Sequence, residues 1–150
     1  MSIRAADAAV LDASVTATWL LPDEHDEASQ RLYKRVRAGA MQLHAPDLWL
    51  WECGNIVANG VKRSRIAPAD AVLVWSVLDA IRTRVELAAF EPMQVRACLM
   101  LAIDEGLSIY DAAYLWLALS LKLPLLTHDG ALSRAATRQQ VAVLRLEDIA

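Results

Sequence analysis

Short apolar runs alternate along this chain with longer segments in which apolar side chains recur at helical spacing. The apolar runs predict five short strands, at residues 8–11, 41–45, 85–87, 125–127 and 141–144. The intervening segments predict helices at residues 14–21, 23–38, 46–63, 68–82, 92–106, 109–121 and 130–138. Strands that alternate with helices form βα units. We therefore expect an α/β fold with a mostly parallel sheet covered by helices on both faces.

The composition is that of an ordinary globular domain. With 150 residues, 56% of them hydrophobic, the chain can bury a substantial core, and we expect residues 1–150 to form a single domain. Cys53 and Cys98 lie far apart in apolar helical segments and are predicted to be core residues. Residues 1–11 lack the apolar stretch of a leader, and the apolar run 112–121 is too short to span a bilayer. We expect a soluble cytoplasmic protein.

The net charge of −3 argues against nucleic-acid binding by bulk electrostatics alone, since phosphate contacts normally depend on Lys and Arg. A local basic patch remains compatible with it. Three basic clusters are available, and each is more often a solvated helix face than a binding site. They are Lys34, Arg35 and Arg37; Lys62, Arg63 and Arg65; and Arg82 and Arg84.

Four carboxylates interrupt apolar surroundings: Asp12, Glu52, Asp111 and Asp129. Asp12 and Asp129 follow predicted strands directly, so both are expected at the carboxyl edge of the sheet, where sites of α/β folds gather. The other two are on helices. Isolated buried carboxylates must be paired, protonated or bound to a cation. Mg2+ or Mn2+ prefers such oxygen ligands and leaves room for a substrate phosphate, so the set predicts a divalent metal site.

Each carboxylate also has an ordinary structural explanation. Asp12 or Ser14 can cap the helix that follows the first strand, and Asp129 with Gly130 can form a turn. Ser108 and Asp111 have the spacing of a capping box, which is compatible with metal binding. Glu52 can belong to a solvated helix face.

Polar neighbours accompany the acids. Glu52 shares a helix face with Asn55 and Asn59, and Ser14 and Thr127 stand where hydroxyls can orient a ligand carboxylate or a water. The three histidines lack the spacing of a zinc site. The five tryptophans are more often core residues or anchors of a partner interface than platforms for bases.

In order, the motifs are Asp-x-Ser at Asp12, Glu-x-x-Asn at Glu52, Tyr-Asp-Ala-Ala-Tyr around Asp111 and Thr-x-Asp ending at Asp129. Over nearly the full length the chain resembles the PIN domain family, specifically the VapC toxins of prokaryotic toxin-antitoxin pairs. The resemblance implies a three-layer α/β/α fold with a five-stranded sheet in the order 3-2-1-4-5. It also implies an acidic pocket for Mg2+ or Mn2+, formed by the four carboxylates and the accompanying Ser14, Asn55 and Thr127.

The resemblance further implies a ribonuclease that cuts RNA, commonly structured RNA, of which tRNA is one candidate. Such proteins are usually homodimers and are held inactive by a cognate antitoxin whose tail enters the active-site groove. Two alternatives remain: a catalytically silent binding module, and a phosphatase of the haloacid dehalogenase type. The phosphatase needs Asp-x-Asp after the first strand, but Ser14 occupies the second position.

Overall fold

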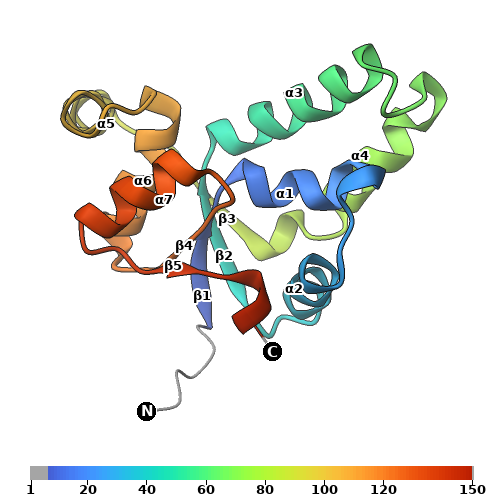
Figure 1. Cartoon of the computed structure of the whole chain (residues 1–150), viewed down its shortest axis with the longest axis horizontal. Helices are drawn as coiled ribbons and strands as arrows, with labels where there is room; N and C mark the ends of the chain where they lie inside the picture. The colour runs from blue at the N-terminus through green and yellow to red at the C-terminus, as the bar shows by residue number, and fades with distance from the viewer. Residues whose placement is uncertain (1–6, 150) are drawn as a thin grey trace.

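The core of the fold is a five-stranded parallel sheet, seen in a computed structural model that describes residues 7–149 (Figure 1). The strands are β1 (Ala8–Leu11), β2 (Gln42–Pro46), β3 (Val85–Ala88), β4 (Leu125–Leu126) and β5 (Val143–Leu144). Their order is β3-β2-β1-β4-β5, and each neighbouring pair is parallel. The predicted fold class and strand order are confirmed.

Helices cover both faces of this sheet. Within residues 7–149 they are α1 (Ala13–Leu20), α2 (Glu27–Arg37), α3 (Leu48–Lys62), α4 (Ala71–Asp79), α5 (Pro92–Glu105), α6 (Ile109–Leu121) and α7 (Gly130–Arg138). Figure 1 shows α1–α4 on one side of the strands and α5–α7 on the other. Helix α6 packs on β1, β2 and β4, and α5 packs outside it on α6. The result is the three-layer α/β/α architecture.

The central strand β1 is apolar because it is buried on both faces, as strands of parallel sheets are. Ala9, Val10 and Leu11 are fully buried. Val10 pairs with His44 of β2 on one side and with Leu125 of β4 on the other. This double pairing fixes the carboxyl end of β1 beside that of β4.

The chain reverses its direction of travel across the sheet between β1 and β4. From β1 it proceeds outward through β2 to β3, then returns to build β4 and β5 on the opposite side of β1. Ligand sites of open α/β sheets lie outside the carboxyl ends of strands at such a switch point. Asp12 follows β1 there, and residues 127–129 follow β4.

The helix predicted at residues 23–38 is wrong in its first part. Residues Pro22–Glu24 form a separate 3-10 helix, η1, and α2 begins only after Asp26. The Asp26 side chain accepts a hydrogen bond from the Ser29 N–H at 2.8 Å and so caps α2. Asp23 and Glu24 instead bind Arg65, at 2.8 and 3.0 Å.

Other predicted boundaries shift by a few residues. Helix α4 ends at Asp79 rather than at residue 82, because 3-10 turns then lead into β3. Pro46 belongs to β2, where it pairs with Ala88, so α3 begins at Leu48. Strand β5 begins at residue 143 rather than 141, since the Val141 N–H is bonded to the Ala136 carbonyl at the end of α7.

Two further predictions can be compared with the structure. Cys53 and Cys98 are both buried free thiols, as expected. Among the described residues, no helix has the length and apolar character required to cross a membrane.

Candidate metal centre

Asp12 lies at the deepest point of the site, directly after β1 and at the start of α1. It is only 3% exposed. It occupies the capping position of α1, but its side chain makes no capping hydrogen bond. Instead, Oδ2 accepts hydrogen bonds from the Ser14 hydroxyl at 2.6 Å and the Thr127 hydroxyl at 2.8 Å. The capping explanation for Asp12 is therefore wrong, and its carboxylate is oriented by two hydroxyls.

The same two hydroxyls tie the β1 end to the β4 end. Thr127 Oγ1 accepts from the Asp129 N–H at 3.0 Å, and Ser14 Oγ accepts from the His128 N–H at 2.9 Å. The hydroxyl oxygens of Ser14 and Thr127 are 3.3 Å apart. Positions separated by more than 100 residues in sequence thus form one small network, and the backbone of residues 127–129 is fixed relative to Asp12.

Asp129 combines a structural role with its position in the site. Its Oδ1 accepts a hydrogen bond from the Leu132 N–H at 2.7 Å, which caps α7. The ordinary role of Asp129 is therefore that of a helix cap, and the predicted turn with Gly130 is wrong because Gly130 begins α7. Its Oδ2 remains outside that hydrogen bond, and the charge of Asp129 still raises the pKa of Asp12 and of Asp111.

Glu52 lies in the first half of α3 and is half-buried, so the interpretation of this residue as part of a solvated face is wrong. Its Oε1 is buried and has no hydrogen-bond partner, and the hydroxyl of buried Tyr114 is likewise unsatisfied. Burial, followed by the charges of Asp12 and Asp111, raises the pKa of Glu52 to about 7, while the nearby Tyr114 hydroxyl lowers it. An unsatisfied buried carboxylate oxygen is costly, and a cation or a proton would relieve that cost.

Asp111 lies in the first turn of α6. Its N–H donates to the Ser108 hydroxyl at 3.1 Å, so Ser108 caps α6 as the spacing predicted. Burial, then the charges of Asp12 and Asp129, raise the pKa of Asp111, and Ser108 opposes this effect. Capping therefore uses the backbone of Asp111 and leaves its carboxylate to the site.

Charges within this set of four raise the pKa values of three of its members, Asp12, Glu52 and Asp111. Burial raises the pKa of Asp12 despite the hydrogen bonds from Ser14 and Thr127. No Lys or Arg forms an ion pair with any of the four acids within residues 7–149. Uncompensated carboxylates around an unsatisfied oxygen are the donor set that a hard divalent cation takes, so the residues fit such an ion.

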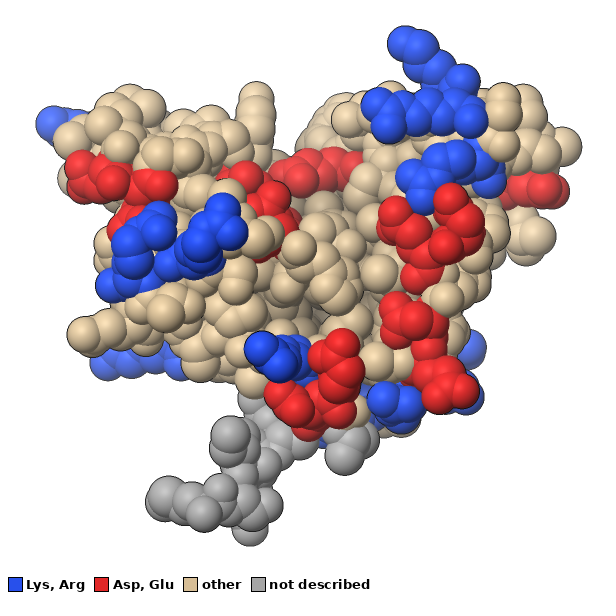
Figure 2. All heavy atoms as spheres, in the orientation of Figure 1, with Lys and Arg blue, Asp and Glu red and all other residues tan. Residues whose placement is uncertain are grey.

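The side chains do not form a closed cage. In the part of the chain that is described, no three Asp, Glu, His or Cys side chains are arranged as a ready-made set of ligands. This arrangement is compatible with Mg2+, which keeps several waters and is often bound by only one or two carboxylates together with substrate phosphates. Space for these groups is visible in Figure 2, where a notch between α3 and the α5–α7 side of the molecule has acidic side chains at its floor.

The three polar residues predicted to accompany the acids, Ser14, Asn55 and Thr127, differ in their contacts. Ser14 and Thr127 contact the acids directly. Asn55 is exposed on α3, one turn beyond Glu52, and among the described residues its side chain has no hydrogen-bond partner. Tyr114 was missed by the sequence analysis. The available signal was its spacing, since a residue three positions after Asp111 on a helix shares a face with it.

The three basic clusters do not converge on the acids. Lys34, Arg35 and Arg37 lie in the last turn of α2, which leads to the amino end of β2. Arg65 is bound by Asp23 and Glu24, whereas Lys62 and Arg63 are exposed at the far end of α3. Arg82 and Arg84 precede β3 and therefore lie at the opposite, amino-terminal edge of the sheet.

Comparisons with known proteins agree with this fold. The family model described as PIN domain matches residues 9–138. The family match and the strand order of this α/β/α domain agree with each other. The chain belongs to the PIN domain family. Its likeness to Ribonuclease VapC3 of Pyrobaculum aerophilum groups it with the VapC-type members: the two are 27% identical over 124 residues, covering 83% of this chain and 91% of the relative.

A solved structure supports the fold independently. The crystal structure of PAE2754 from Pyrobaculum aerophilum superposes with a TM-score of 0.68. The match covers 96% of this chain and 92% of that chain at 21% sequence identity.

Proposed function

We propose that this chain is a divalent-metal-dependent endoribonuclease, the toxin of a VapBC-type toxin-antitoxin pair. The observation that carries the proposal is the unsatisfied Glu52 oxygen among three further carboxylates at the switch point of a PIN domain. The likeness to a protein named Ribonuclease VapC3 supports hydrolysis of RNA as the reaction. Such an enzyme would act in the cytoplasm, where its RNA substrates and its antitoxin are found.

In this proposal Asp12, Glu52, Asp111 and Asp129 hold Mg2+ or Mn2+. When bound, the ion would acidify a water and stabilise charge on the phosphate under attack. Ser14 and Thr127 keep the Asp12 carboxylate in one orientation. Asp129 is held in place by the cap that it forms on α7. The carboxylates need not act as bases themselves.

The test is cleavage of a panel of structured cellular RNAs, tRNAs included, by the purified chain with Mn2+ or Mg2+. A chelator and the variant Asp111→Asn should each abolish cleavage. Asp79→Asn, which removes an exposed carboxylate at the end of α4, is the matched control and should cleave normally. Cleavage retained by Asp111→Asn in nuclease-free preparations would contradict the assignment.

A catalytically silent binding module is the alternative, and the absence of a ready-made three-ligand set within residues 7–149 is the observation in its favour. It predicts Mn2+ binding with no turnover of any RNA. The phosphatase alternative has less support, because Ser14 donates its hydroxyl to Asp12 where that chemistry requires a second acid.

Two partners follow from the proposal. A cognate antitoxin would place a basic segment in the acidic notch, and its addition should stop cleavage. A second copy of the chain is the other partner. Apolar side chains exposed along α5, such as Met93 (83% exposed) and Ile103 (65% exposed), support a homodimer. Sedimentation of the purified chain and of Ile103→Glu should give a dimer and a monomer, respectively.

A further inference from the structure

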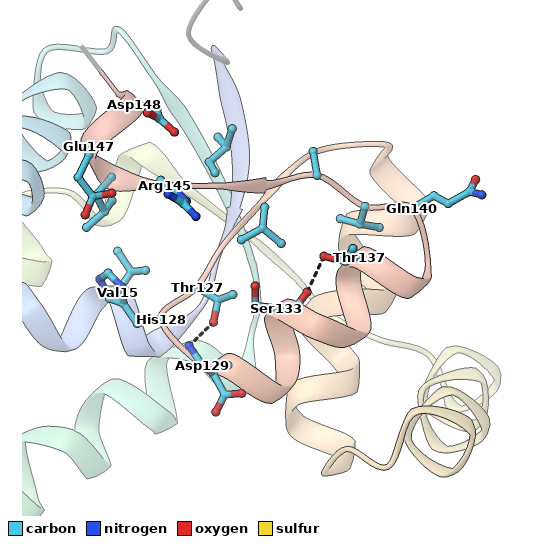
Figure 3. Close-up of a pocket in the computed structure, with 16 residues that line it drawn as sticks. Val15, Thr127, His128, Asp129, Ser133, Thr137, Gln140, Arg145, Glu147 and Asp148 are labelled. Atoms are coloured by element: carbon cyan, nitrogen blue, oxygen red, sulfur yellow. Dashed lines mark hydrogen bonds between the residues drawn. The ribbon is translucent and has the colours of Figure 1, made fainter.

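A second hollow lies beside the acidic cluster, at the carboxyl ends of β4 and β5 (Figure 3). It has a volume of about 900 Å3. Its walls are residues 127–130, one side of α7, Val15 and residues 140–148. The cavity is large enough for a nucleotide and shares Thr127 and Asp129 with the candidate metal centre.

Residues 127–129 separate the two compartments. On one side Thr127 donates to Asp12, and on the other side the same loop forms a wall of the cavity. Figure 3 shows the Asp129 carboxylate turned away from the cavity interior. A strand whose phosphate lies at the acids therefore has to cross only this short loop to place the adjoining nucleotide in the cavity.

Arg145 is the positive charge in this cavity. It faces His128 and Thr127 across the open space in Figure 3. Within residues 7–149 the Arg145 side chain has no hydrogen bond or ion pair. A guanidinium beside a cavity with no protein partner is available to an anion, and its planar fork of donors suits a phosphate.

The remaining wall restricts the kind of anion. Glu147 and Asp148 also line the cavity, and their charge disfavours inorganic phosphate or a free triphosphate. A nucleotide within a strand carries a single negative charge, which Arg145 can bind. Its base offers N–H donors of the kind that carboxylates accept. The base must be unpaired to expose them, as is usual where proteins read RNA.

We propose that this cavity binds one unpaired RNA nucleotide next to the cleaved bond, with Arg145 on the phosphate of that nucleotide. The proposal rests on the ribonuclease function proposed above. It adds a specificity site, formed by residues 127–130 and 140–148, to the acidic cluster.

The kinetic test compares Arg145→Gln with Arg82→Gln, which removes an exposed arginine at the opposite edge of the sheet. Loss of a charged phosphate contact should raise KM for an RNA substrate about tenfold with little change in kcat. Arg145→Lys should recover part of the loss, and Arg82→Gln should match the unaltered chain. An unchanged KM for Arg145→Gln would overturn the proposal while leaving the nuclease function standing.

A binding test separates the two proposals. The affinity of a fluorescent single-stranded RNA for the full chain is measured in chelator, so that no cleavage is required. Arg145→Gln should weaken binding and lower the salt dependence by about one counterion. If Arg145→Gln weakens RNA binding but the unaltered chain cuts no RNA, the cavity is supported as an RNA site and the proposed nuclease function is refuted. Equal affinity for a free nucleoside monophosphate and for the strand would overturn the cavity as a site for RNA.

Discussion

Two carboxylates on different sides of the acidic cluster, Asp12 and Glu52, differ in the hydrogen bonds that their oxygens accept. Asp12 is the more deeply buried, yet its Oδ2 accepts two hydrogen bonds from hydroxyls that the strand ends hold in place. Glu52 is only half-buried, and its Oε1 has no partner. The difference teaches that depth of burial does not identify the carboxylate in greatest need of a cation. That carboxylate is identified by the number of hydrogen-bond donors around each of its oxygens.

Removing the charge of Asp12, the hydrogen-bonded carboxylate, should have the largest effect on RNA cleavage. In Asp12→Asn the amide oxygen can still accept from Ser14 and Thr127, so the fold should survive. The lost ligand should reduce RNA cleavage by at least on the order of 100-fold, since a metal ion supplies several kcal/mol of charge stabilisation. Cleavage rates and thermal unfolding of the same preparation check both statements. A folded variant with near-normal cleavage would remove Asp12 from the site.

Breaking the hydroxyl network should have a smaller effect. Thr127→Val removes the donor to Asp12 and the acceptor for the Asp129 N–H while preserving shape. Partners that orient ligands are typically worth about 10–100-fold in metal affinity or activity. Mn2+ titration calorimetry and cleavage rates should show this loss, whereas Thr83→Val, an exposed change near β3, should show none. Equal values for the two variants would mean that the network does not position Asp12.

Near Glu52, whose Oε1 has no hydrogen-bond partner, Tyr114→Phe tests whether the tyrosine hydroxyl orients the Glu52 carboxylate. We expect Mn2+ affinity to fall by up to about tenfold, the low end for such partners. Stability should hardly change, because the hydroxyl has no hydrogen bond to lose. Tyr33→Phe is the opposite control: its hydroxyl donates to the Val77 carbonyl at 2.8 Å, so it should lose stability and keep Mn2+ affinity. Unchanged affinity in Tyr114→Phe would make its hydroxyl a passive neighbour.

The smallest expected effect is a pH dependence of stability without metal. The pKa of Glu52 is raised from 4.5 to about 7, so the folded state takes up a proton that the unfolded state does not. This contribution to stability is complete below pH 4.5 and is lost as the pH rises through 7. Glu52→Gln should therefore unfold a few °C above the unaltered chain at pH 8 in chelator, with the advantage disappearing near pH 4.5.

Asp79→Asn serves as the control for that comparison, since its carboxylate is exposed. Added Mn2+ should stabilise the unaltered chain more at pH 8 than at pH 5, because protons compete with the ion for the same oxygens. The interpretation fails if Glu52→Gln has the same advantage at both pH values.

The sequence was sufficient for the parts of this molecule that depend on local pattern. Apolar runs placed all five strands within a few residues, and the rule that sites follow strand ends placed Asp12 and Asp129 together. Glu52 and Asp111 were included in the site as carboxylates in apolar helical segments, and the family resemblance supported that choice, because a helix position does not by itself tell which face meets the sheet edge.

What the sequence could not provide was set by contacts between distant segments. Asp23 and Glu24, which were predicted to open α2, instead form ion pairs with Arg65, far along the chain. The partnerless oxygens of Glu52 and Tyr114 also depend on how α3 and α6 pack, which no local pattern encodes. The cavity containing Arg145 is formed by segments on either side of β5 together with the loop after β4.

The network that joins Ser14 to Thr127 has a consequence for the timing of protein synthesis. A ribosome builds the chain from its amino end, and the segment with Asp12 emerges long before the segment with Thr127 and Asp129. The central strand β1 must wait for β4 as its second neighbour. Under the proposed function, a growing or prematurely terminated chain that lacks residues 127–129 would have an incomplete cutting centre and would be harmless to the cell that makes it.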